Sequence, residues 1–190
     1  VFSTVGDVTL VSEADITAEI ARDFDALAIR SKTTVTDAFF TPGSKLRFVG
    51  TATAGTDHLQ AKPTDPNIRI VSAGGCNANS VAEFVVAALL ELEWETGKKL
   101  SGLTLGIVGH GHVGKAVEKR VGALGIRCLI TDPPLAVQTA DAKYLSLDAV
   151  LASADILTLH VPLIEEGRWP TRRFIAANQL ALLGKEAWLI

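Results

Sequence analysis

The segment LGIVGHGHVGKAVEKRVGALGIRCLITD, residues 105–132, limits the possible fold more than any other part of the chain. An apolar run precedes three glycines at 109, 111 and 114, an amphipathic stretch follows over about 112–124, and a second apolar run ends at Asp132. A strand, a tight glycine turn, a helix and a second strand in this order are typical of parallel strands joined by a crossover helix. We therefore expect a parallel α/β sheet.

The three glycines have different expected roles. Gly109 permits a tight exit from the strand, Gly111 removes a side chain that would block a pyrophosphate, and Gly114 lets the helix pack close to the sheet. The backbone N–H groups from about His112 onward then point at a bound anion. A GxGxxG pattern alone is weak evidence, but here a strand precedes it and a helix follows it. The turn is therefore a candidate dinucleotide-binding site.

Asp132 indicates which dinucleotide is bound. It lies 18 residues after Gly114, at the end of the second apolar strand. A carboxylate at this position can accept hydrogen bonds from both ribose hydroxyls of an adenosine, whereas it would repel a 2′-phosphate. The pattern therefore favours NAD over NADP. The alternative is a tight turn with a solvated aspartate at a strand end.

Strand and helix patterns alternate along the whole chain, which predicts a Rossmann-type doubly wound parallel sheet. The longest helix pattern covers about 80–96, with Asn79 or Ser80 as its cap and Gly97 at its end. We place the domain boundary near its start, giving domains 1–78 and 79–190. Strands are expected at 7–11, 26–31, 45–52, 67–73, 103–109, 126–132, 155–162 and 186–190, and other helices at 13–22, 112–124, 146–154 and 172–183.

Composition limits the partners and the compartment. The net charge is −3 with acids and bases interspersed, so no basic stripe favours nucleic acid or an anionic membrane surface. The apolar run 81–94 is too short to span a bilayer.

Cys76 and Cys128 lack a partner motif, which favours a reducing, cytoplasmic location. His110 and His112 have no neighbouring ligand residues, so no metal site is expected. The absence of methionine and the apolar end EAWLI suggest a fragment lacking both natural ends.

Five motifs together resemble the NAD-dependent D-2-hydroxyacid dehydrogenases: VGTATAGTDHL at 49–59, GCNANSVAEFVVAALLEL at 75–92, GIVGHGHVGKAV at 106–117, TDPP at 131–134 and LTLHVPL at 157–163. The resemblance implies a flavodoxin-like substrate domain over 1–78, an NAD-binding Rossmann domain over 79–190, and homodimers formed largely through the latter. It also implies a phosphorylated 2-hydroxy acid as substrate. The branch with the most similar motifs oxidises 4-phospho-D-erythronate to the 2-oxo acid in vitamin B6 biosynthesis.

The resemblance also assigns residues to ligands. Ser31 and Thr53 match the family's substrate contacts, and His112, Val113, Asp132 and Val161 match its cofactor contacts. Val161 is a departure, since a threonine is common there, and it could keep a backbone contact but not a hydroxyl contact. The family's catalytic arginine, glutamate and histidine are expected beyond Ile190, so no residue of this chain is assigned a catalytic role.

Some assignments from the residues themselves stay open. The small residues 53–56 could form a concavity of N–H groups for a carboxylate, or an ordinary strand-to-helix turn capped by Thr56. Arg30 and Lys32 could attract a phosphate or be solvated. His160 could line the cofactor crevice or be hydrogen-bonded at a strand end. Other hydroxy acids, such as D-3-phosphoglycerate, and a noncatalytic NAD-sensing role remain alternatives.

Overall fold

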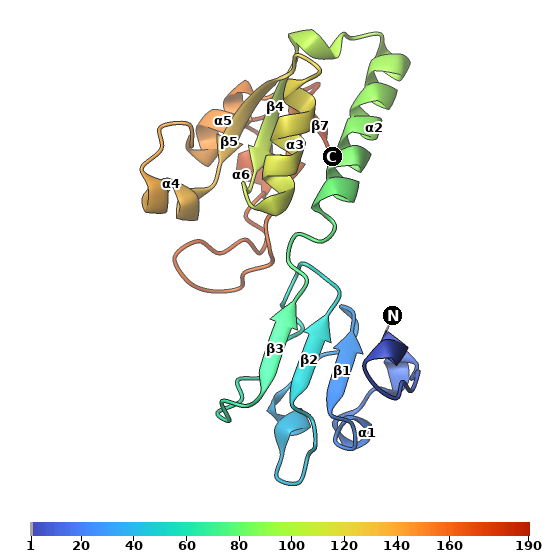
Figure 1. Ribbon diagram of the computed structural model, residues 1–190. Coiled ribbons are helices and arrows are strands. Elements are labelled where there is room, and N and C mark those ends of the chain that lie inside the picture. Colours follow the sequence, from blue (N-terminus) through green and yellow to red (C-terminus); the bar gives the residue numbers. More distant parts are fainter. Residues whose placement is uncertain (1) are drawn as a thin grey trace. The chain divides into compact units, whose positions relative to one another are not determined.

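The computed structural model describes residues 2–190 and divides into two compact units, the first ending at Gly74 and the second covering Gly75–Ile190. The division therefore falls a few residues before the expected boundary, ahead of the long helix. Within residues 2–190, every strand pair of the two units is parallel, as the alternating sequence pattern predicts (Figure 1). No helix within residues 2–190 has the length and apolarity needed to span a membrane.

The first unit is built on a three-stranded sheet. Its strands are β1 (Ala26–Ile29), β2 (Phe48–Thr51) and β3 (Arg69–Ser72), in the order β1-β2-β3. Helix α1 (Ala18–Ala21) and three short 3-10 helices, at Phe2–Thr4, Glu13–Asp15 and Asp37–Phe40, complete it. Its buried core combines strand residues with residues of the connections: Ala21, Ile29, Val35, Phe39, Leu46 and Val49.

Two predictions at the start of the chain are wrong. The predicted strand at 7–11 is irregular, and Val8 and Leu10 are exposed, so its alternating apolar residues have no sheet to pack into. The predicted helix at 13–22 is broken because Thr17 has an extended backbone. The Thr17 side chain accepts a hydrogen bond from the Ile20 N–H at 3.3 Å and begins the new helix α1 there.

The second unit contains α2 (Ala78–Thr96), a 3-10 turn at Leu100–Gly102, and the strands β4 (Thr104–Val108), β5 (Arg127–Thr131), β6 (Ile156–Leu159) and β7 (Trp188–Leu189). The strand order is β5-β4-β6-β7. Helices α3 (His112–Gly122), α4 (Pro133–Thr139), α5 (Leu147–Ser153) and α6 (Ala177–Leu180) connect the strands. The chain adds β5 on one side of β4 and β6 on the other, so the winding reverses between β4 and β6.

This sheet is buried on both faces, as expected for a doubly wound fold. One core cluster joins Leu105 and Ile107 of β4 to α2 and α3 through Val85, Leu89 and Val117. A second cluster joins Val108 of β4 to α5 through Val150 and Leu151. Alternate residues of β4 therefore pack in different clusters, which holds the end of this strand, and the turn that follows it, in place.

The ends of the helices test the capping predictions. Gly97 ends α2 in the left-handed conformation, with φ 70°, which confirms the predicted stop. The N-cap of α2 is Asn77, not Asn79 or Ser80, and the Asn79 side chain instead accepts a hydrogen bond from Arg120. The predicted helix at 172–183 is wrong, because Arg173 has a φ of 54° and only α6 is helical there.

Candidate functional site

Three residues predicted near the ligand follow three adjacent strands. Val108 pairs with Thr131 of β5 and with Leu159 of β6, so the next residues along the chain, Gly109, Asp132 and His160, share the carboxyl edge of the sheet. This edge includes the point where the winding reverses between β4 and β6. Ligands of open α/β sheets bind outside the carboxyl ends of the strands at this reversal.

Two of the three glycines are required by the packing of the protein itself. Gly109 has a φ of 90°, and a Cβ there would lie 2.5 Å from the backbone oxygen of His160. A Cβ on Gly114 would lie 2.1 Å from the backbone oxygen of Gly109. Both distances are far below contact distance, so any larger residue must displace backbone. These glycines bring β4, the turn, α3 and the end of β6 close together.

Gly111 differs from the other two glycines, because a Cβ there would meet open space. Within residues 2–190, no atom apart from those of Gly111 and its two chain neighbours lies within 4 Å of that position, and its φ of −73° is accessible to any residue. The space in front of Gly111 is therefore open. Gly111 is also the N-cap of α3, whose first turn has no side-chain cap, and the N–H of Lys115 is bonded to the Gly111 carbonyl. The N–H groups of the first turn are thus left to an external acceptor.

This geometry fits a dinucleotide pyrophosphate. An anion in the open space before Gly111 would meet the N–H groups of His112 and Val113 at the positive end of the α3 dipole. A Cβ at position 111 would fill the same space. The N–H groups supply directed hydrogen bonds, whereas the helix dipole contributes only about 0.3–1 kcal/mol per interaction.

Asp132 makes two contacts within the protein that sequence reasoning missed. Its Oδ2 accepts a hydrogen bond from the His110 N–H at 2.8 Å, and its Oδ1 accepts one from the Leu135 N–H at 3.0 Å. The first bond holds the carboxylate against the glycine turn, and the second caps α4. A carboxylate has about four lone-pair sites, so acceptor capacity remains for ribose hydroxyls. The carboxylate is therefore oriented before any ligand binds.

His110 is a structural residue whose contacts within the protein were not predicted from the sequence. Its side chain is buried and bridges two others, with Nε2 2.7 Å from Oε2 of Glu118 and Nδ1 3.1 Å from the hydroxyl of Tyr144. These contacts connect the turn to α3 and to the segment after α4.

Burial, and to a lesser extent the nearby Glu118, raise the pKa of the Cys128 thiol to about 11, which keeps this thiol neutral at physiological pH.

His160 and Val161 lie at the end of β6. The His160 Nε2 is 3.0 Å from the hydroxyl of the buried Thr158, which agrees with the strand-end alternative. Partial burial lowers the pKa of His160, so the ring is neutral at pH 7. Val161 packs against the cluster that contains Val108 and Leu157. The contact of Val161 with the cofactor remains a prediction, and so does the position of His160 in the cofactor crevice.

In the first unit, the substrate candidates also follow neighbouring strands. Ile29 pairs with Thr51, so Ser31 and Thr53 lie beyond the same edge of the sheet. Ser31 is exposed. Lys32 is 82% exposed and lies 4.0 Å from Glu13, so it belongs to a solvated ion pair of small energetic value. Arg30 is exposed as well, and in residues 2–190 it forms no ion pair.

The loop after β2 presents a row of N–H groups. In the described chain no helix lies between Thr56 and β3, so the alternative of a helix capped by Thr56 is wrong. Across residues 2–190, no protein acceptor takes a hydrogen bond from the backbone N–H groups of 53–58. The hydroxyl of Thr53 is already engaged, since it donates to the Gly55 carbonyl at 3.0 Å. The loop therefore offers main-chain donors to an anion more readily than the Thr53 hydroxyl.

Metal ligation is not supported by the side chains described. Within residues 2–190, no three or more His, Cys, Asp or Glu side chains are grouped so that they could hold a metal ion. His110 in particular uses both ring nitrogens within the protein, on Glu118 and Tyr144.

Solved structures share this fold. An NAD⁺-bound 3-phosphoglycerate dehydrogenase from Entamoeba histolytica superposes with a TM-score of 0.72 at 22% identity, covering 90% of this chain and 56% of that one. An NAD-dependent formate dehydrogenase from Staphylococcus aureus, in complex with NAD, gives a TM-score of 0.70 at 23% identity, covering 95% of this chain and 60% of that one. At these identities the similarity establishes the fold, which confirms the predicted parallel α/β class.

Sequence relatives are more similar. Erythronate-4-phosphate dehydrogenase from Chromohalobacter salexigens is 42% identical over the 190 residues, all of this chain and 49% of the relative. The protein of the same name from Klebsiella pneumoniae is 45% identical over 183 residues, 96% of this chain and 48% of the relative. The chain thus spans about half the length of the curated relatives it matches.

Residues 80–190 match the family described as D-isomer specific 2-hydroxyacid dehydrogenase, NAD binding domain. The matched segment begins in α2 and includes the glycine turn, Asp132 and all four strands of the second sheet. The chain belongs to the D-isomer specific 2-hydroxyacid dehydrogenases, and its second unit carries the family's NAD-binding domain.

Proposed function

We propose that the protein containing this chain oxidises 4-phospho-D-erythronate with NAD: the hydride of C2 passes to NAD, the 2-hydroxyl releases its proton, and a 2-oxo acid is left. The observation that carries the proposal is the 42% identity to erythronate-4-phosphate dehydrogenase along the whole of this chain. The open space before Gly111 and the oriented carboxylate of Asp132 support NAD as the oxidant. Bound NAD would supply the hydride acceptor.

The residues of this chain would bind and orient the reactants. The N–H groups of His112 and Val113 hold the pyrophosphate, and Asp132 accepts hydrogen bonds from the ribose hydroxyls. In the first unit, the free N–H groups of the loop 53–58 receive the substrate carboxylate, beside Ser31. Cys76 and Cys128 are free thiols, which suits a cytoplasmic enzyme.

The test is a substrate panel with the full-length protein. NADH formation would be followed with 4-phospho-D-erythronate, D-erythronate, D-3-phosphoglycerate and D-lactate. We expect the highest kcat/KM for 4-phospho-D-erythronate, at least about tenfold above D-erythronate, because the phosphate adds charge-assisted hydrogen bonds. Equal or better turnover of an unphosphorylated acid would contradict the substrate assignment. NAD binding without turnover of any acid would favour the NAD-sensing alternative.

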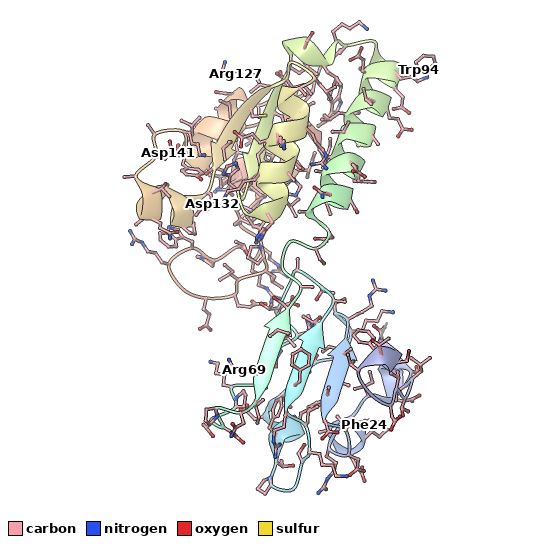
Figure 2. All side chains as sticks on the ribbon, in the orientation of Figure 1. Phe24, Arg69, Trp94, Arg127, Asp132 and Asp141 are labelled. Atoms are coloured by element: carbon pink, nitrogen blue, oxygen red, sulfur yellow. The ribbon has the colours of Figure 1, made fainter. Side chains whose placement is uncertain are left out.

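We also infer that the protein is a homodimer that associates through α2. Three large apolar side chains of this helix are exposed, Phe84 by 68%, Leu90 by 50% and Trp94 by 88%. Trp94 projects from α2 into solvent in Figure 2. Large exposed apolar residues grouped on one element are typical of interaction surfaces.

A charge placed in this surface tests the dimer. Trp94→Glu should convert the full-length protein to a monomer at micromolar concentration, because a carboxylate in an apolar interface is not compensated. Light scattering after gel filtration gives the mass. Val137→Glu is the matched control, since Val137 is 60% exposed on α4, away from α2. An unchanged dimer mass for Trp94→Glu would place the interface elsewhere.

A further inference from the structure

A buried chain of hydrogen bonds ends in the loop that we assign to the substrate carboxylate. His58 is 4% exposed and Thr51 is 3% exposed. The His58 Nε2 lies 2.9 Å from the Thr51 hydroxyl oxygen, which lies 2.8 Å from the hydroxyl oxygen of Thr53. The Thr53 hydroxyl contacts the carbonyl of Gly55 at 3.0 Å. Four residues are thus linked in series, from the interior of the first unit to its edge.

The direction of every bond in this series follows from the number of protons. A carbonyl only accepts, so Thr53 donates its single hydroxyl proton to Gly55. The Thr53 oxygen must then accept from Thr51, which uses the only hydroxyl proton of Thr51. The Thr51 oxygen must therefore accept from the His58 ring, which places a proton on Nε2. Only one neutral tautomer of His58 satisfies all three bonds.

The opposite tautomer would release the loop. If Nε2 of His58 were the acceptor, Thr51 would donate to the ring, and Thr53 would have to donate to both Thr51 and Gly55. A hydroxyl has one proton, so the Gly55 bond or the Thr51 bond would be lost. In the described chain, Nδ1 of His58 is buried without a hydrogen-bond partner, so the bond to Thr51 is the only hydrogen bond of the ring.

We propose that His58 is a positioning residue for substrate binding. By donating from Nε2 to Thr51, it directs the Thr53 hydroxyl onto Gly55, and this bond keeps the loop turned with its N–H groups free. The assignment rests on the proposed function, in which these N–H groups receive the substrate carboxylate. One consequence is that Thr53 acts through its place in the loop, because its hydroxyl proton is not available to the substrate.

The tautomer can be measured without any substrate. Long-range ¹H–¹⁵N correlation spectra of full-length protein with ¹⁵N-labelled histidine report which ring nitrogen carries the proton. The His58 signals are identified by their loss in the His58→Gln variant. We expect a neutral ring with its proton on Nε2. A proton on Nδ1 would overturn the proposal.

Kinetics test the effect on substrate. His58→Leu and Thr51→Val each break the series while keeping apolar volume, and each should raise the KM for 4-phospho-D-erythronate by about tenfold with kcat within about threefold. In His58→Gln the amide nitrogen can take the place of Nε2, so KM should return to within about threefold of the original value. The double variant, His58→Leu with Thr51→Val, should raise the KM no further than either single variant, because both substitutions break the same series of hydrogen bonds.

The fold of the first unit in each variant is checked by circular dichroism and thermal unfolding of the full-length protein, and the affinity for NAD checks the second unit. Unchanged KM in a His58→Leu variant that binds NAD normally would overturn the proposal, as would additive effects in the double variant. If His58→Leu fails to fold, Thr51→Val, in which a β-branched residue of the same shape occupies β2, gives the same test. An Nε2 tautomer in a protein that does not oxidise the phosphorylated acid would instead identify the proposed function as the part that failed.

Discussion

The Gly111→Val variant should lose at least about 100-fold in NAD affinity, about 2.7 kcal/mol, while its second unit stays folded. The expected loss follows from the open space before this residue, where a Cβ meets no protein atom. A valine side chain would occupy the space in front of the α3 N–H groups and keep the pyrophosphate from reaching them. Because the φ of Gly111 is −73°, the substitution brings no left-handed backbone strain.

Calorimetric titration with NAD measures this effect, and circular dichroism measures the fold. Gly122→Val is the matched control, since Gly122 lies at the other end of α3 and a Cβ there also meets no atom within 4 Å. That variant should bind NAD within about threefold of the unmodified protein, because no bond to the ligand changes. Normal binding by a folded Gly111→Val protein would rule out the turn as the pyrophosphate site.

The Asp132→Ala variant should weaken NAD binding by about 10- to 100-fold, the effect of removing hydrogen bonds to a charged group. The preference for NAD over NADP should narrow, because the carboxylate that repels a 2′-phosphate is gone. The variant should also lose about 1 kcal/mol of stability with the N-cap of α4. The bond from the His110 N–H is lost as well, which loosens the glycine turn.

Titrations with both dinucleotides, together with thermal unfolding, separate these effects. Asp141→Ala is the control, because Asp141 follows α4, accepts a hydrogen bond from the Lys143 N–H and takes no part in the turn (Figure 2). It should leave both affinities unchanged. If Asp132→Ala bound NAD and NADP with their original affinities, the assignment of this carboxylate to the ribose would be wrong.

Local patterns predict the second unit well because its key features depend on neighbours in sequence. The strand before Gly109, the helix after Gly111 and the strand ending before Asp132 are all present in the structure. Gly97 ends α2 by a rule that involves only its own backbone angles. These features can be recognised without any tertiary contact, and together they indicate an NAD-binding domain.

Features that depend on long-range contacts were missed. The His110 ring contacts Tyr144, which is 34 residues away, and the Asp132 carboxylate accepts a hydrogen bond from the His110 N–H, which is 22 residues away. Helix α4 begins with two prolines, whose fixed φ suits a first turn, but the sequence analysis predicted no helix there. The false strand at 7–11 had the right alternation but no partner strand.

A crystal structure of the full-length protein with NAD would show whether the glycine turn binds the pyrophosphate. We expect pyrophosphate oxygens within hydrogen-bond distance of the N–H groups of His112 and Val113, in the space before Gly111. We also expect ribose hydroxyls to donate to Asp132 while the His110 N–H keeps its bond to the same carboxylate. A dinucleotide bound elsewhere, with the turn between β4 and α3 free of phosphate, would contradict the account.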